Sequence, residues 1–304
     1  MNIQQLNAEF GIANQIEFIA GKGGLPCIQI NNEKASALIS VYAGQVLSFK
    51  PVNEAEDLMF ISENAYFQEG KAIKGGIPIC WPWFGAAPDN TEQLKKPDHG
   101  FVRNRFWSVL AATTLENGDS KIVLEFEDSE KTREIWPYRF YLSLEIVVGD
   151  SLTLELLTRN TGDQSFSITE ALHSYFNVGD AAQATVLGLE HTEYLDKNED
   201  FVKVCQVGAI TIAQETDHIH TDIKHKLVID DPAFKRKIKI SSSGNKNVVV
   251  WNPWAKGAAE MKDLDSDDYK HFICLEVANA AADSVEVLSN SEYRIDANYS
   301  IVPR

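Results

Sequence analysis

Apolar and polar residues alternate along most of this chain, so the dominant period is two rather than the 3.6 of a helix. Every second residue of 140–148 is apolar, and the alternation resumes over 152–156 after the turn Gly149-Asp150. Strands with one buried face produce this pattern, and a short glycine-containing turn joins two of them into a hairpin. We therefore expect an antiparallel hairpin over residues 139–158.

Similar alternation predicts several further strands. They cover residues 37–49, 121–127, 224–229, 235–240, 247–251, 272–278 and 293–301. Turn sequences such as Asn117-Gly118, Gly162-Asp163 and Gly244-Asn245 separate these runs at short intervals. This spacing is typical of antiparallel sheets rather than of strands that alternate with helices.

Helical signals are sparse. Ser129 is a suitable N-cap for a helix over residues 130–136, which Pro137 then stops. Because strands dominate and no linker or repeat divides the chain, we predict an all-β fold, a large antiparallel β-sandwich with few short helices. We assign residues 1–304 to a single domain.

The net charge of −16 narrows the classes of partner. Nucleic acid and acidic membranes repel a polyanion, so we expect neither as a partner. No run approaches the roughly 20 apolar residues of a membrane span, and the first residues lack the pattern of a signal peptide. The four cysteines are widely spaced and form no metal-type pair. We expect a monomeric cytoplasmic protein with reduced cysteines.

Residues 74–85 and 99–104 carry an unusual mixture of glycine, proline and aromatic side chains. Such a mixture excludes a regular helix or a central strand. Four cations flank these segments, namely Lys71, Lys74, Arg103 and Arg105. A rigid, aromatic-walled loop between cations suits a polyol ring with an anionic tail. The alternative is a well-packed loop of a β protein.

Glu276 is the single charged residue of 272–278, a run typical of a strand that is buried on both faces. The odd-numbered residues would face the core, whereas Cys274 and Ala278 share the side of Glu276 and leave it room. A buried carboxylate must be paired, neutralised or face a cavity. Desolvation raises its pKa, which suits a general base. The alternative is a structural, ion-paired glutamate.

His173 lies within residues 170–177, where alternation groups it with Tyr175 on one face and places Leu172 and Phe176 on the other. The second face is apolar and suits the core. We therefore expect His173 to point into a cleft. The alternative is a core histidine that is bonded to a backbone carbonyl.

Other candidate residues give weaker signals. Asp217 lies in a polar stretch that we interpret as a connection, and His218, His220 and His225 do not follow the spacing of a metal site. The aromatic turn at 251–254 suits either a sugar platform or a packing corner. The sequence contains neither a phosphate-binding glycine loop nor a nucleophile elbow.

Together these segments resemble the aldose 1-epimerase superfamily, in particular its hexose-6-phosphate mutarotase branch. The matching stretches follow the family's order over residues 30–304 and comprise 74–85, 97–104, 171–179, 194–197, 216–217, 250–253 and 272–278. The resemblance implies a β-sandwich of the galactose mutarotase type, with the sugar in a cleft on a concave sheet. It implies an isomerase that needs neither metal nor cofactor and acts on glucose 6-phosphate or a similar sugar phosphate.

The resemblance also implies roles for individual residues. His173 matches the family's general acid and Glu276 its general base. The implied substrate-binding residues are Lys74, Asp98, His99, Arg103 and Asp217. Interconversion of anomers requires a base at the C1 hydroxyl and an acid at the ring oxygen, and a carboxylate and a protonated imidazole supply both.

Two departures from the family pattern leave other functions open. Lys74 stands where the family usually has arginine and lacks the bidentate fork that matches a phosphate. Asp98 adds a negative charge that does not favour an anionic ligand. One alternative is therefore an aldose 1-epimerase for unphosphorylated sugars. Another is a non-catalytic carbohydrate-binding protein, against which the presence of both His173 and Glu276 argues.

Overall fold

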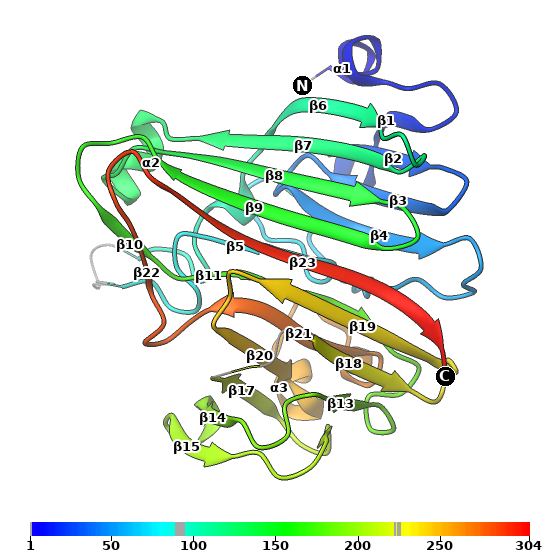
Figure 1. Ribbon diagram of the computed structural model, residues 1–304, viewed down its shortest axis with the longest axis vertical. Coiled ribbons are helices and arrows are strands. Elements are labelled where there is room, and N and C mark those ends of the chain that lie inside the picture. The colour runs from blue at the N-terminus through cyan, green and yellow to red at the C-terminus, as the bar shows by residue number, and fades with distance from the viewer. Residues whose placement is uncertain (1, 89–94, 222, 224–225) are drawn as a thin grey trace.

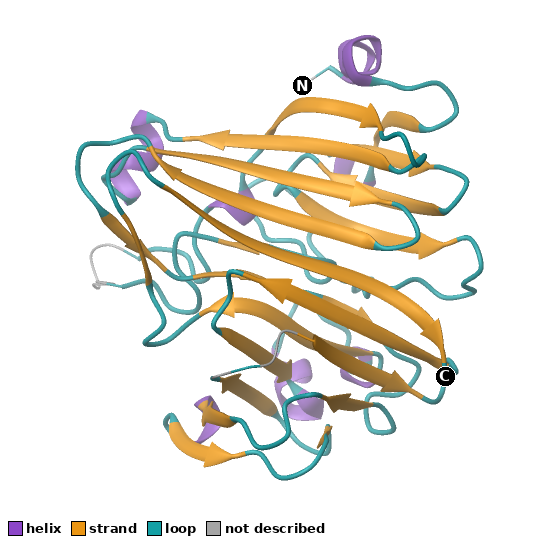
Figure 2. Cartoon of the chain, viewed as in Figure 1, coloured by secondary structure: helices purple, strands orange, loops and turns teal. Residues whose placement is uncertain are grey.

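Antiparallel strands stack in two layers in the computed structural model, which describes residues 2–88, 95–221, 223 and 226–304 (Figure 1). A long twisted sheet faces the viewer, and two shorter sheets lie behind it. The helices are few and short (Figure 2), and α3 (Trp254–Glu260) packs against the outer face of the eight-stranded rear sheet through Ala258. In the described residues, no helix is long and apolar enough to cross a membrane.

The front layer is a nine-stranded sheet, as far as the chain is described. Its strands, in spatial order, are β16 (Ile210–Thr211), β13 (Thr185–Leu187), β18 (Lys226–Asp231), β19 (Arg236–Ser243), β23 (Glu292–Pro303), β9 (Leu152–Asn160), β8 (Phe140–Val148), β7 (Ser120–Glu127) and β6 (Ser108–Thr114). The hairpin expected over 139–158 is confirmed as β8 and β9.

The rear layer contains an eight-stranded and a four-stranded sheet. The eight-stranded sheet comprises β15 (Val202–Cys205), β14 (Glu193–Asp196), β17 (Thr216–His220), β20 (Asn247–Asn252), β21 (Phe272–Asn279), β11 (Glu170–Leu172) and β5 (Ile79–Cys80), with β12 (Tyr175–Asn177) paired to β21. The four-stranded sheet comprises β1 (Ile16–Ala20), β2 (Pro26–Asn31), β3 (Ala35–Ser40) and β4 (Gln45–Pro51). A small pair, β10 (Phe166–Ile168) and β22 (Val285–Val287), adjoins them.

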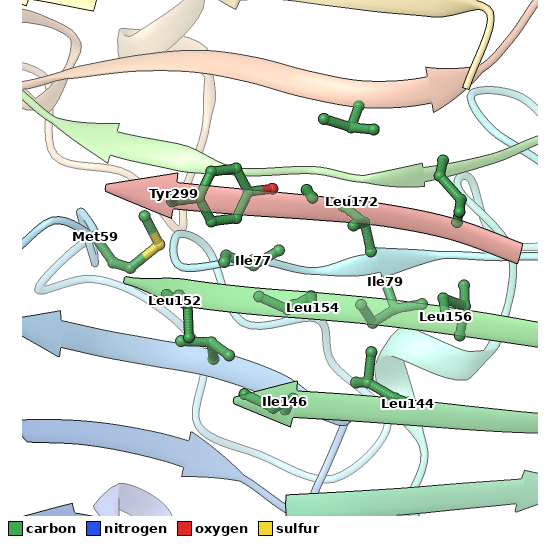
Figure 3. Close-up of a cluster of buried hydrophobic side chains, with 14 of the residues drawn as sticks. Met59, Ile77, Ile79, Leu144, Ile146, Leu152, Leu154, Leu156, Leu172 and Tyr299 are labelled. Carbon is green, nitrogen blue, oxygen red and sulfur yellow. The ribbon is translucent and has the colours of Figure 1, made fainter. Parts of the chain in front are cut away.

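The main core fills the space between the layers (Figure 3). Leu144, Leu154 and Leu156 of the front sheet meet Ile79 and Leu172 of the rear sheet. The alternating side chains of β8 and β9 explain this arrangement, because every second residue is buried. The expected all-β sandwich is confirmed.

The helices are α1 (Ile3–Phe10), α2 (Glu130–Ile135) and α3 (Trp254–Glu260), with 3-10 turns η1 (Lys22–Gly24), η2 (Val102–Asn104), η3 (Lys197–Glu199) and η4 (Asp268–Lys270) in the described residues. The helix predicted over 130–136 is confirmed. The Ser129 side chain accepts a hydrogen bond from the backbone N–H of Thr132. The helices α1 and α3 were not predicted. Both are short, and although Asn2 and Gly11 cap α1, no side chain caps the start of α3.

One predicted strand is wrong. Residues 37–49 form the end of β3, a turn and most of β4 rather than one strand. Ala43 and Gly44 in the turn both have positive φ, 72° and 58°. A reversal there was hard to predict, because alanine rarely adopts this conformation. The strand expected over 224–229 begins in the described residues at Lys226, and Lys224 and His225 lie outside them.

Candidate active site

The outer face of the eight-stranded sheet, turned away from the main core, gathers the candidate residues. Along β21, Ile273, Leu275 and Val277 pack in the main core, so Glu276 points to the outer face with Cys274. All of β21 is buried, as its sequence predicted. The outward-facing side chains of β21 are therefore buried by residues outside the main core.

Strand register brings Asp217 to the same face. Asp217 of β17 is opposite Trp251 of β20, which is opposite Cys274 of β21. Directly opposed residues of antiparallel strands share a face. The prediction that Asp217 lies in a polar connection is wrong, because its stretch pairs with the apolar edge of β20 and becomes a strand.

His173 occupies a break between β11 and β12. Its backbone N–H donates to the carbonyl of Pro78 at 3.0 Å, and the carbonyl of Ser174 accepts from Leu275 at 3.2 Å. The break holds the imidazole against β21, and Nε2 of His173 lies 3.3 Å from Oε1 of Glu276. Leu172 and Phe176 pack in the main core, as alternation predicted.

Aromatic rings fix the orientation of the His173 imidazole. The Tyr175 ring is stacked on it, with centroids 4.9 Å apart. The ring of His99 meets it edge-on at 5.5 Å. Nδ1 of His173 and Oε2 of Glu276 are both buried and have no hydrogen-bond partner among the described residues.

Two tight loops deliver the cationic side chains. Gly75 and Gly76 have φ of 113° and 63°, and a Cβ at either position would lie within 2.5 Å of a backbone carbonyl oxygen. Only glycine permits this close approach, which sets the position of Lys74. The Lys74 ammonium lies 3.6 Å from the carboxylate of Asp263 and 3.8 Å from the sulfur of Met261.

The second loop contains Asp98, His99 and Arg103. Arg103 donates to the backbone carbonyl of Asp98 at 3.1 Å. The backbone N–H of Gly85 donates to Nδ1 of His99 at 3.3 Å, so the proton of the neutral imidazole is on Nε2. His99 itself has a φ of 58° and donates its N–H to the carbonyl of Gly85.

These side chains surround a cavity of about 330 Å³. It is lined by Lys74, Phe84, Asp98, His99, Arg103, His173, Tyr175, Lys197, Asp217, Trp251, Met261 and Glu276. All seven candidate residues from the sequence are therefore together. A second cavity of about 500 Å³ adjoins it and shares Phe84, Asp98, His99 and Lys197.

Lys197 was not among the predicted site residues, yet its ammonium lies 2.5 Å from the carboxylate of Asp217. Asp196, the last residue of β14, is opposite His218 of β17, so the turn η3 that follows begins beside Asp217 and brings Lys197 to the cavity. This signal exists only once the pairing of β14 with β17 is known. Met261 was likewise absent from the predicted site, whereas Tyr175 lies on the face that alternation assigned to the cleft together with His173.

Burial sets the protonation states of the central pair. It raises the pKa of Glu276 well above its ordinary value, and the nearby Asp217 raises it further. Burial lowers the pKa of His173 well below its ordinary value, and His99, Arg103 and Lys74 lower it further. The rise for Glu276 was predicted. The imidazole, however, is neutral in the free site rather than protonated as expected.

The outer residues of the cavity follow the same logic. Burial raises the pKa of Asp217, and the ion pair with Lys197 opposes this rise. Burial lowers the pKa of Lys74, and Asp263 opposes the fall. Each ammonium is thus paired with a carboxylate in the free site.

Parts of the predicted loop serve packing instead. Trp81 and Trp83 are buried in the core, and Phe84 is the aromatic residue of 74–85 that lines the cavity. Lys71 and Arg105 do not line it and instead lie over the rings of Tyr66 and Phe101. The aromatic residues of this loop therefore line the cavity less extensively than the sequence indicated.

The histidines after Asp217 form no common metal site in the described residues. His218 lies 3.4 Å from the carboxylate of Asp196, and His220 shares a hydrogen bond with Thr192. The one group of metal-ligating side chains in the described chain is His173, Cys274 and Glu276.

Over residues 26–300 the chain matches the family described as aldose 1-epimerase. A Salmonella typhimurium protein named "putative glucose-6-phosphate 1-epimerase" is 37% identical over 259 residues, which cover 85% of this chain and 84% of that protein. A Cenchrus ciliaris protein of the same name is 35% identical over 299 residues, covering 94% and 88%.

Solved structures share the fold. A crystal structure titled as a "putative mutarotase (YeaD)" from Salmonella typhimurium has a TM-score of 0.89 and 32% identity, covering 97% of this chain and 96% of that chain. A galactose mutarotase-like protein from Clostridium acetobutylicum has a TM-score of 0.74 and 15% identity, covering 95% and 98%. These similarities confirm the expected β-sandwich of the galactose mutarotase type.

Proposed function

The chain belongs to the aldose 1-epimerase family, and we propose that it interconverts the α and β anomers of a hexose 6-phosphate such as glucose 6-phosphate. As a sugar epimerase the protein is an isomerase. The observation that carries the proposal is the contact between Glu276 and His173, 3.3 Å apart on the wall of a cavity that also presents Lys74 and Arg103.

In the proposed reaction, Glu276 and His173 act as base and acid. One proton transfer from the carboxyl to the imidazole converts the neutral pair into carboxylate and imidazolium. The carboxylate of Glu276 then removes the proton of the C1 hydroxyl while the imidazolium protonates the ring oxygen. The C1–O5 bond breaks and C1 becomes an aldehyde. Rotation about C1–C2 and the reverse transfers close the ring as the other anomer.

The remaining cavity residues hold the sugar. Lys74 and Arg103 offer positive charge to the 6-phosphate. Asp217 and Lys197 offer an acceptor and a donor to ring hydroxyls, and His99 offers its Nε2 proton. The cavity of one chain contains the acid, the base and both phosphate-binding cations. We propose that a monomer is sufficient for catalysis and that residues 1–304 act as one domain.

A free sugar is the second candidate substrate, favoured by one observation. Asp263 lies beside Lys74 and already neutralises its charge. A site whose lysine is paired without a phosphate can accept an uncharged ring, and in that case Lys74 and Arg103 would serve structure. The two substrates are therefore compared in the same experiment.

The test is two-dimensional exchange NMR on equilibrated sugar, which measures the rate of exchange between the α and β anomeric signals above the spontaneous rate. The wild type should accelerate exchange of glucose 6-phosphate, with a higher kcat/KM than for glucose. Glu276→Gln and His173→Asn should each lose about 10²–10⁴-fold, the contribution of a positioned acid or base.

Glu170→Gln is the matched control. Glu170 is also a buried carboxyl of the eight-stranded sheet, with its pKa raised by burial to about 8, but it does not line the cavity. It should retain the wild-type exchange rate. Full activity in Glu276→Gln, or an equal loss in Glu170→Gln, would contradict the assigned roles.

A further inference from the structure

Cys274 takes no part in the proposed reaction, yet it lies beside both central residues. Its sulfur, a ring nitrogen of His173 and a carboxylate oxygen of Glu276 all lie within 4.8 Å of one another. All three side chains are buried. Oε2 of Glu276 has no hydrogen-bond partner among the described residues, although it is buried and its residue lines the cavity.

These three ligand types suit one class of ion. Thiolate, imidazole and carboxylate together bind zinc and similar borderline or soft divalent cations. Zinc binds such ligands at about 2.0–2.3 Å, so ligand atoms around one tetrahedral ion lie roughly 3.5 Å apart. The separations of up to 4.8 Å must therefore shorten by up to about 1.3 Å when the ion binds.

Two of the three cationic side chains that line the cavity are already neutralised. The Lys74 ammonium is paired with Asp263 and the Lys197 ammonium with Asp217, whereas the Arg103 guanidinium donates to the backbone carbonyl of Asp98. Ionised Cys274 and Glu276 would bring two negative charges against the double charge of the ion. The cavity side leaves a fourth coordination position for water, as in open zinc sites.

We propose that Cys274, His173 and Glu276 form a binding site for Zn²⁺ or a similar thiophilic divalent cation, and that its occupation inhibits the enzyme. The ion takes the carboxylate and the imidazole out of proton transfer together. Binding is a property of the three side chains alone, whereas the inhibition rests on the proposed function.

The direct test is absorption spectroscopy of the full-length protein titrated with Co²⁺, because a cobalt–thiolate bond gives an intense near-ultraviolet band. The wild type should show this band, and added Zn²⁺ should remove it. Cys274→Ser and Cys274→Ala should lack it. Cys80→Ser is the matched control, because Cys80 is also a free, buried cysteine of this sheet but lies outside the ligand group, and it should keep the band.

The second test is inhibition of anomer exchange by Zn²⁺. The concentration for half inhibition should rise at least about tenfold in Cys274→Ser and stay unchanged in Cys80→Ser, and a chelator should restore activity. A wild type without the cobalt band, or Cys274 variants that keep it, would overturn the site whatever the activity. A protein that shows the band but does not accelerate exchange would instead refute the proposed function and leave the site standing.

Discussion

Glu276 and His173 contact each other where water hardly reaches, with side chains 2% and 9% exposed. Burial favours the neutral form of each group, so the free pair carries its proton on the carboxyl. The reactive form, carboxylate and imidazolium, has the same total number of protons. The two forms differ only in which partner holds the proton, so their ratio does not change with pH.

A bell-shaped pH profile is therefore expected, with its limbs assigned in the reverse of the usual order. Because the pKa of His173 is lowered, the pair gains its second proton at the imidazole on the acid limb. Because the pKa of Glu276 is raised, the pair loses its last proton at the carboxyl on the alkaline limb. Exchange rates measured across pH should show both limbs.

Nitrogen NMR of ¹⁵N-labelled histidine supplies the microscopic check on this order. His173 should be neutral at pH near 7 in the free protein, with His173→Asn identifying its signals. A cationic His173 at that pH, or a rate that is flat across the range while chemistry limits turnover, would contradict the argument.

Asp263 should weaken the binding of a phosphate group by Lys74. Its carboxylate lies 3.6 Å from the Lys74 ammonium and competes with any anionic ligand. Asp263→Asn should lower KM for glucose 6-phosphate by about two- to fivefold, the effect of a partly exposed ion pair. The KM for glucose should stay unchanged, as measured by exchange NMR with both sugars.

Asp267→Asn is the control for this substitution. Asp267 lies four residues further on and pairs with Lys270 instead, so its removal changes the net charge equally. Equal effects of the two variants, or a matching change for free glucose, would show that Asp263 has no specific competition with phosphate.

At the scale of elements, sequence periodicity predicted the strands better than the loops. The alternation of β21 revealed both its burial and the exceptional position of Glu276, because the rule depends on neighbours in sequence alone. Asp217 was placed in a connection, since its strand status depends on pairing with β20. The position of a loop residue such as Lys74 depends on the positive φ angles of Gly75 and Gly76, which composition alone does not predict.

The loop that carries His99 and Arg103 offers a sharp test of such a conformation. Gly100 has a φ of 73°, and a Cβ there would lie 1.7 Å from the carbonyl oxygen of Trp81. Gly100→Ala must displace this loop, and a shift of about 1 Å at a catalytic site can cost around 10²-fold in rate. We expect a comparable fall in kcat/KM and a loss of stability to urea.

Gly118→Ala separates displacement from backbone strain. Gly118 also has a positive φ, 86°, but nothing lies within 4 Å of its added Cβ. It should lose roughly 1–3 kcal/mol of stability, the cost of this backbone conformation, and keep full kcat/KM. If both variants lost kcat/KM equally, displacement of the loop by the Cβ at position 100 would not explain the loss.

On the scale of the whole molecule, three strands of the eight-stranded sheet, β12, β20 and β21, have two functions. Their inner side chains join the main core, and an outer side chain of each lines the cavity. Local patterns could predict the inner faces, and resemblance to a family pointed to seven of the residues that line the cavity. Neither could predict the ion pairs of Lys197 with Asp217 and of Lys74 with Asp263, which form only when separate strands and loops meet.

This division predicts opposite effects from one core and one site substitution. Leu154 is fully buried between the layers, so Leu154→Ala should lower the free energy of unfolding by about 2–5 kcal/mol. Leu154 lies on β9 of the front sheet, away from the cavity lining, so kcat per folded molecule should not change.

Glu276→Gln should behave in the reverse way. Because the pKa of Glu276 is higher in the folded than in the unfolded protein, this carboxyl contributes stability at pH values below its unfolded-state pKa. That stability is lost as pH rises through its folded-state pKa. Glutamine has no such penalty, so the variant should gain stability relative to the wild type as pH rises from about 5 to about 9, while catalysis is lost. Urea unfolding of both variants at several pH values measures this. A stability difference between Glu276→Gln and the wild type that stays constant with pH would mean that the carboxyl is not held neutral by burial, and the reversed protonation order would fall with it.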